Sequence, residues 1–198
     1  MNEKQRNMLT RYGFSFKKGG AHLSRTLMLA ELNQLLAYVD DDQAEKKDYI
    51  SAIVTDNCLG KRSGRTRMLT ARHLADLYSL DPTIALFRNL LYFWRRDKPG
   101  QPLIAFLCAY ARDPVLRLSQ PYIFSIEQQH SAFREELERF LDDLKPERFS
   151  KATLKSVAQN INSSWTQSGH LSGRVKKTRT RARATPGVVA YMLLLGFL

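Results

Sequence analysis

Apolar residues recur at intervals of three and four along most of this chain, which is the spacing of an amphipathic α-helix. Several helices are predicted from this pattern, and each lies between segments rich in Gly, Pro or charged residues. They span about 24–39, 43–57, 68–79, 83–96, 103–112, 131–144 and 150–167, with a shorter segment beginning at 114 and a last one from 186 to the end. The pattern therefore predicts an all-α protein.

Pro in the first helical position marks three of these starts, at Asp81-Pro82, Asp113-Pro114 and Thr185-Pro186. Apolar residues surround the helix of 83–96 almost completely, so we expect it at the centre of the core. The terminal run VVAYMLLLGFL is predicted to be a buried helix, because about a dozen apolar residues fall short of the roughly 20 that cross a membrane. We accordingly expect a cytoplasmic protein without a membrane partner.

The stretch KKTRTRARAT, residues 176–185, alternates basic and small residues. On a helix its arginines would scatter around the axis, whereas on a strand Arg179, Arg181 and Arg183 would share one face at intervals of roughly 6.6 Å. The preceding HLSGRVK segment offers a partner strand, with Leu171 and Val175 as its apolar positions. The pattern favours an ordered basic β-hairpin, and a flexible basic tail is the alternative.

This order of helices and hairpin is close to that of a winged helix-turn-helix. We therefore predict a compact multi-helix fold with an N-terminal helical lobe, 1–120, and a C-terminal helical lobe, 121–198, that carries the hairpin. The long helix that begins at Ser150 would direct polar residues toward a nucleic-acid groove. These are Lys151, Lys155, Gln159, Asn160 and Asn162.

The net charge of +12 is unevenly distributed, and no Asp or Glu follows Glu147. A second basic segment is the loop GKRSGRTR, in which Gly60 and Gly64 let the backbone approach a phosphate. Such clusters indicate a polyanionic partner, although a generally basic soluble surface or a merely exposed loop would look similar. The candidate nucleic-acid contacts are Lys61, Arg62, Arg65, Arg67, Lys151, Lys155, Arg174, Lys176, Lys177, Arg179, Arg181 and Arg183.

Catalytic signatures are missing from the sequence, including phosphate-binding loops, nucleophile elbows and paired metal-binding histidines. The four histidines are isolated, and Asp142 and Asp143 point to different faces of a helix. Cys58 and Cys108 form no CxxC pair, which favours reduced thiols, and arginines near Cys58 in the sequence are the alternative argument for a thiol of lowered pKa. We expect a protein that is not an enzyme, with no cofactor, metal or small-molecule substrate.

Three segments resemble the BrxA family of bacterial BREX (bacteriophage exclusion) defence systems. They are NCLGKRSGRTRMLTARHLADLYSLD, ALFRNLLYFWRRDKPGQPLIAFLCAYARDPVLR and SSWTQSGHLSG. The resemblance extends from about Leu23 to Leu198 and rests on overall pattern, because the family has no short catalytic signature.

The resemblance implies a helical fold like that of the antitermination factor NusB, double-stranded DNA binding, and a role in phage restriction beside other BREX proteins. It supplies no individual binding residues. Two other functions fit the residues: RNA binding of an antitermination-like kind, and assembly of the BREX complex by docking a basic face on an acidic protein.

Overall fold

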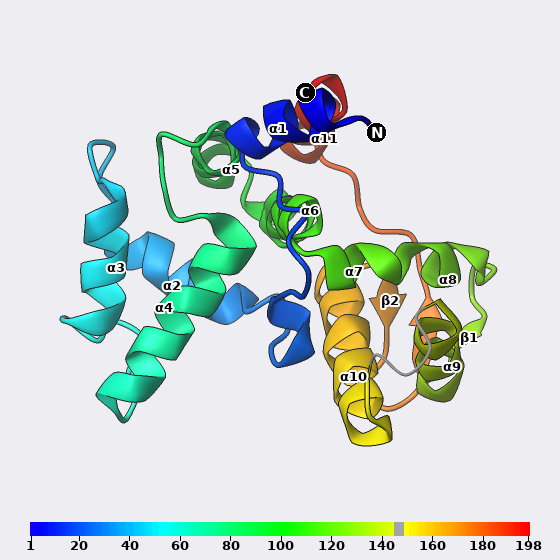
Figure 1. Ribbon diagram of the computed structural model, residues 1–198. Helices are drawn as coiled ribbons and strands as arrows, with labels where there is room; N and C mark the ends of the chain where they lie inside the picture. Colours follow the sequence, from blue (N-terminus) through cyan, green and yellow to red (C-terminus); the bar gives the residue numbers. More distant parts are fainter. Residues whose placement is uncertain (145–148) are drawn as a thin grey trace.

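The computed structural model describes residues 1–144 and 149–198 (Figure 1). Most of these residues are helical, and a small three-stranded antiparallel sheet lies near the C-terminus. The predicted fold class, an all-α fold with a short basic hairpin, is therefore confirmed. The likeness to NusB stays an expectation from the resemblance.

The first half of the chain contains six α-helices and two short 3-10 helices among its described residues. They are α1 (Glu3–Tyr12), η1 (Ala21–Leu23), α2 (Leu29–Tyr38), α3 (Lys46–Val54), α4 (Gly64–Tyr78), α5 (Ala85–Arg96), η2 (Lys98–Gly100) and α6 (Gln101–Arg112). The described part of the second half contains α7 (Pro114–Leu118), α8 (Gln120–Ser125), β1 (Ser131–Ala132), α9 (Arg134–Leu144), α10 (Lys151–Gln167), β2 (Leu171–Ser172), β3 (Lys177–Arg179) and α11 (Pro186–Phe197).

The predicted start signals act as expected at three helices. Asp113 caps α7 by accepting hydrogen bonds from the amides of Val115 (2.8 Å) and Leu116 (3.1 Å). Pro186 opens α11, and the Ser150 hydroxyl accepts the Thr153 amide at the start of α10. The Asp113 and Ser150 side chains satisfy amides that a helix start leaves unpaired.

Two other predicted starts are displaced. The Asp81 carboxylate accepts from the Thr83 amide and hydroxyl, so residues 81–84 form a turn and α5 begins at Ala85. The predicted helix of 24–39 begins only at Leu29, because Met28 has the left-handed backbone conformation (φ 51°) that ends the preceding loop. Helix α1 was not predicted, and it buries none of its residues.

Helix α6 occupies the centre of the core, where it packs against α4, α5, α10 and α11. The prediction that the helix of 83–96 would be central is wrong, because α5 buries Leu90 and Trp94 but exposes Arg88 and Tyr92. The terminal helix was also predicted to be buried. That prediction is wrong as well, since α11 exposes the residues Val189, Met192, Leu193 and Phe197.

The last helix returns to the first part of the chain. Helix α11 packs against α5 and α6. The expected lobe boundary after residue 120 falls within α8, and buried residues form one cluster across it. Whether the two lobes are separate units stays a prediction. No helix among the described residues has both the length and the hydrophobicity to cross a bilayer.

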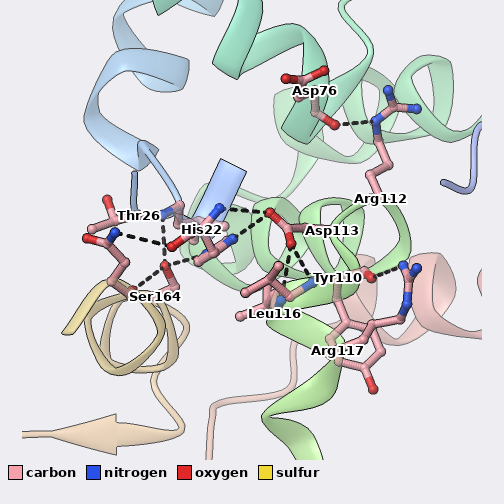
Figure 2. Close-up of polar contacts among 12 residues, drawn as sticks. His22, Thr26, Asp76, Tyr110, Arg112, Asp113, Leu116, Arg117 and Ser164 are labelled. Carbon is pink, nitrogen blue, oxygen red and sulfur yellow. Dashed lines mark hydrogen bonds and ion pairs between the residues drawn. The ribbon is translucent and has the colours of Figure 1, made fainter. Parts of the chain in front are cut away.

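A chain of buried hydrogen bonds joins η1, α7 and α10 (Figure 2). His22 contacts the Asp113 carboxylate through Nδ1 (2.8 Å) and through its backbone amide (3.0 Å), and its Nε2 lies 2.8 Å from Ser164 Oγ. The same Oγ accepts the Leu27 amide (2.8 Å) and donates to the Asn160 carbonyl (3.0 Å). All three side chains of the chain are buried. They tie segments more than 90 residues apart into one arrangement.

Burial alone would raise the pKa of Asp113. The hydrogen bonds and charge of His22, together with the Leu116 amide, outweigh burial and hold this pKa below its usual range. Stability gained in this way is present above the unfolded pKa and is lost as the pH falls through the folded one.

We predict that Asp113→Asn destabilises the fold by about 2–4 kcal/mol, because the amide nitrogen of Asn would face N–H donors from which the carboxylate accepted hydrogen bonds. Urea unfolding at neutral pH measures this loss. Wild type should also lose part of its stability as the pH falls below about 4, the ordinary range of Asp, whereas the variant should lack this component.

Asp143→Asn is the matched control, since Asp143 is exposed on α9 and should change stability by less than about 0.5 kcal/mol. Equal stability of the two variants at neutral pH would contradict a structural role for the His22–Asp113–Ser164 chain.

Candidate nucleic-acid interface

The C-terminal elements have the winged helix-turn-helix order that the sequence suggested. Helices α9 and α10 pack against each other and are followed by the β2–β3 hairpin, in which Leu171 pairs with Arg179 and Ser172 with Thr178. The sequence did not predict β1, which pairs with the other edge of β3 and gives the strand order β1-β3-β2. The basic strand is therefore the central strand of this sheet.

Helix α10 has one buried and one exposed face. Its apolar residues Leu154, Val157, Ile161 and Trp165 follow helical spacing and pack into the core. The exposed face begins with Lys151 and continues through Lys155, Ser156 and Gln159. In Figure 1 this helix runs upward from the lower edge of the molecule, with β2 beside it.

The wing is the turn of residues 173–176 between β2 and β3. Gly173 has φ 96°, and a Cβ atom there would lie 2.1 Å from the Lys176 carbonyl oxygen, so only glycine fits the turn. Arg174 and Lys176 are exposed in the wing, and so is Val175, at 95%. Val175 was expected as an apolar position of the partner strand, but that strand ends at Ser172, and Val175 lies in the turn.

A polar hollow of about 660 Å³ separates the wing from the helices. Its lining comes from the segment before and at the start of α9, from the middle of α10, and from the wing with the start of β3. These residues are Ala132, Phe133, Arg134, Glu135, Gln159, Asn162, Ser163, Arg174, Val175, Lys176 and Lys177. Lys177 is half-buried there, and burial lowers its pKa. Its ammonium donates to the Gly173 carbonyl (2.7 Å). The hollow brings together amides, a hydroxyl and several cations.

Two of the expected groove-facing asparagines point elsewhere. Asn160 donates through its amide to the His22 carbonyl (3.2 Å) and accepts from Ser164 Oγ through its own carbonyl, so it joins the hydrogen-bond chain around His22. Asn162 is only 5% exposed, and its Oδ1 has no hydrogen-bond partner among the described residues. Of the polar residues expected on this helix, Lys151, Lys155 and Gln159 alone face outward.

Arg179 is a structural residue rather than a surface cation. It is 5% exposed, its guanidinium donates to the carbonyls of His170 (2.9 Å) and Thr180, and it lies 5.0 Å from the centre of the Phe124 ring. Burial lowers the pKa of Arg179. Burial, followed by the charge of Arg179, also lowers the pKa of His170 to about 4. An imidazole beside this guanidinium is therefore neutral at physiological pH.

The expectation that Arg179, Arg181 and Arg183 share one strand face is wrong. Strand β3 ends at Arg179, and residues 180–185 continue without regular structure to α11. Arg181 and Arg183 are exposed in that segment, so they are accessible to a ligand where Arg179 is not. The period of two predicted a strand in this segment, but the strand covers only Lys177–Arg179, and the pattern did not show which of its residues faces the core.

The second basic segment lies at the start of α4, whose first turn is capped by Ser63. Arg62 and Arg65 are exposed, whereas the Lys61 ammonium pairs with Glu31 (3.2 Å) and Arg67 donates to the Val54 carbonyl (3.2 Å). None of the cations of this segment lines the hollow beside the wing, and η1 packs on both α4 and α10. Figure 1 shows that both helices begin at the same lower edge of the molecule.

Two residues of the hollow were missed or misplaced by sequence reasoning. Phe133 falls within the predicted helix of 131–144, but it lies between β1 and α9 and is 52% exposed. Arg134, at the start of α9, pairs with Glu135 (2.5 Å) and Glu138 (3.0 Å). A two-residue strand has no periodicity that a sequence pattern could reveal, so the break before α9 carried no signal.

The side chains that could be candidates for catalysis have environments typical of structural residues. Burial, together with the charge of Asp56, raises the pKa of Cys58, so the expected influence of nearby arginines does not activate this thiol. His22, Asp113 and Ser164 are linked in the order of a catalytic triad, but all three are buried and Ser164 Oγ is occupied by Leu27 and Asn160. No group of His, Cys, Asp and Glu within the described ranges could hold a metal ion.

Comparison with models of known protein families gave no match, and no curated protein matched the chain at a significant level.

We predict different effects for two neighbouring arginines. Arg179→Ala should lower the free energy of unfolding by about 1–3 kcal/mol, because it removes a buried cation that binds two carbonyls. Arg181→Ala, in the exposed segment, should change it by less than about 0.5 kcal/mol. Urea unfolding of both variants measures the difference, and equal stabilities would refute the structural role of Arg179.

Proposed function

We propose that this protein is a non-enzymatic component of a BREX bacteriophage-defence system that binds double-stranded DNA. In this proposal α10 lies in the major groove, while the wing and the segment around Arg181 and Arg183 contact phosphates. The observation that carries the proposal is the exposed polar face of α10 beside the basic wing. The exposed cations that the proposal involves are Lys151, Lys155, Arg174, Lys176, Arg181 and Arg183.

The shape of this surface suits a duplex. A major groove about 12 Å wide admits one α-helix, and α10 projects an exposed side that carries no acidic residue. Cations on a turn beside such a helix are placed for the flanking phosphates. Gln159, the outward amide on α10, is the residue best placed to reach a base edge, so most of the affinity should come from phosphate contacts.

Single-stranded RNA is the second candidate ligand. The exposed ring of Phe133 lines the hollow beneath the wing, and single-stranded bases stack on exposed aromatic rings. Duplex DNA has no unstacked bases to offer to this ring. Competition between a DNA duplex and an RNA strand of equal length therefore separates the two candidates.

The BREX setting rests on the resemblance to the BrxA family along most of the chain. A DNA-binding subunit would bring other components of such a system to phage or host DNA. Assembly through other BREX proteins is compatible with this role, because the helices α3, α5 and α11 lie away from the hairpin (Figure 1).

We predict that DNA affinity falls steeply with salt. If the six exposed cations each meet a phosphate, the slope of log K against log salt should be about −5. Arg174→Ala combined with Lys176→Ala should reduce the magnitude of the slope by about 2, since each phosphate contact contributes roughly 1. Fluorescence anisotropy with a labelled duplex across a salt series measures both values.

Lys4→Ala combined with Arg11→Ala is the control of equal charge change. Both residues are exposed on α1, at the opposite edge of the molecule from the start of α10 (Figure 1). An affinity insensitive to salt, or equal losses for the two double variants, would contradict binding through the wing.

A further inference from the structure

A groove of about 1210 Å³ lies between α3 and α5, remote from the wing. Its apolar side chains come from both helices and from the segments that precede them, and they are Ala44, Ile50, Val54, Pro82, Leu91 and Tyr92. Tyr92 is 50% exposed, although it belongs to a helix whose inner face is fully packed. An apolar groove between two helices is a common docking site for a third helix.

The groove is held open by the packing of its two walls. Helix α3 packs on α2 and α4, whereas α5 packs on α6 and α11. Below the groove the rings of Tyr49 and Phe87 meet edge to face at 5.3 Å. Ion pairs connect the two sides, from Arg95 to Asp40 (3.6 Å) and Asp42, and from Lys46 to Asp81 (3.7 Å). The walls are therefore fixed without closing on each other.

The groove is lined by more basic than acidic residues. Its acidic residues Asp42, Glu45 and Asp81 pair with Arg95, Lys47 and Lys46, respectively.

Two groove arginines remain without an acidic partner among the described residues, and they are Arg88 and Arg96. Arg88 donates to the Thr83 carbonyl (3.3 Å), and Arg96 donates to the Tyr92 carbonyl (3.0 Å) while lying 3.8 Å from the centre of the Tyr92 ring. Two uncompensated cations thus border an apolar floor, a combination that fits an apolar ligand carrying negative charge.

The size of the groove fits a short helix. A helix about 10 Å across that fills 1210 Å³ is roughly 15 Å long, or about ten residues. Such a helix presents three or four apolar side chains on one face and room for acidic side chains beside them.

We propose that the α3–α5 groove docks an acidic amphipathic helix of a protein partner. The apolar face of that helix packs on Val54, Leu91 and Tyr92, and its acidic residues pair with Arg88 and Arg96. A nucleic acid fits less well, because its backbone offers no apolar face for this floor. The site is independent of the proposed DNA surface, so each can fail without the other.

The test uses fluorescence anisotropy with the full chain and a small panel of labelled helical peptides of about 14 residues. Each peptide carries Leu at helical spacing with flanking Glu, and each has a twin with Lys in place of Glu. We expect saturable binding of the Glu peptides and about tenfold or weaker binding of the Lys twins. Saturating duplex DNA should leave peptide binding unchanged.

Groove variants locate the site. Arg88→Glu combined with Arg96→Glu should weaken Glu-peptide binding about tenfold or more and improve binding of the Lys twins. Tyr92→Ala should also weaken binding of the Glu peptides about tenfold, through lost apolar contact. Arg174→Ala combined with Lys176→Ala is the matched control, with full peptide binding expected. Circular dichroism confirms that each variant is folded.

Three results would overturn the proposal. They are a lack of saturable binding for every Glu peptide, equal binding of the Lys twins, and displacement of bound peptide by duplex DNA or by anionic lipid vesicles. Displacement by DNA or by vesicles would assign the groove to a nucleic acid or to a membrane surface instead.

Discussion

The buried chain from Asp113 through His22 to Ser164 is the interaction on which the arrangement of this molecule depends. It contacts three elements that are far apart in sequence, and it leaves the imidazole and the carboxylate with partners on every side. A buried polar group without a partner costs free energy, so these elements are stable only in this one relative position. The direction in which α10 exposes its polar face follows from that constraint.

Local rules in the sequence explain many of the elements that surround this chain. Ser150, Asp113 and Pro186 lie at helix starts as predicted, because capping depends on a few neighbouring atoms. The alternation in residues 176–185 also predicted a strand, and the structure contains it from Lys177 to Arg179. Patterns of this kind are local, so they can be recognised in the sequence without knowledge of the fold.

What the sequence could not show is which side of an element faces the core. Arg179 and Arg181 have the same place in the alternation, yet one is buried against Phe124 and the other is exposed. Phe133 and Tyr92 look like core residues by composition, but both are exposed because of tertiary packing. The sequence thus predicted which segment carries the candidate site. Only the fold showed which residues of that segment are exposed and which are buried.

Arg179 and Gly173 give the wing a property that reaches beyond its charge. The guanidinium donates to the carbonyls of His170 and Thr180 at the open end of the hairpin, and the turn at the other end accepts only glycine at its first residue. A turn fixed in this way has little conformational freedom to lose when a ligand immobilises it, whereas a flexible basic tail would lose much more. The cations of the wing are therefore preorganised, and a larger share of each electrostatic contact can appear as affinity.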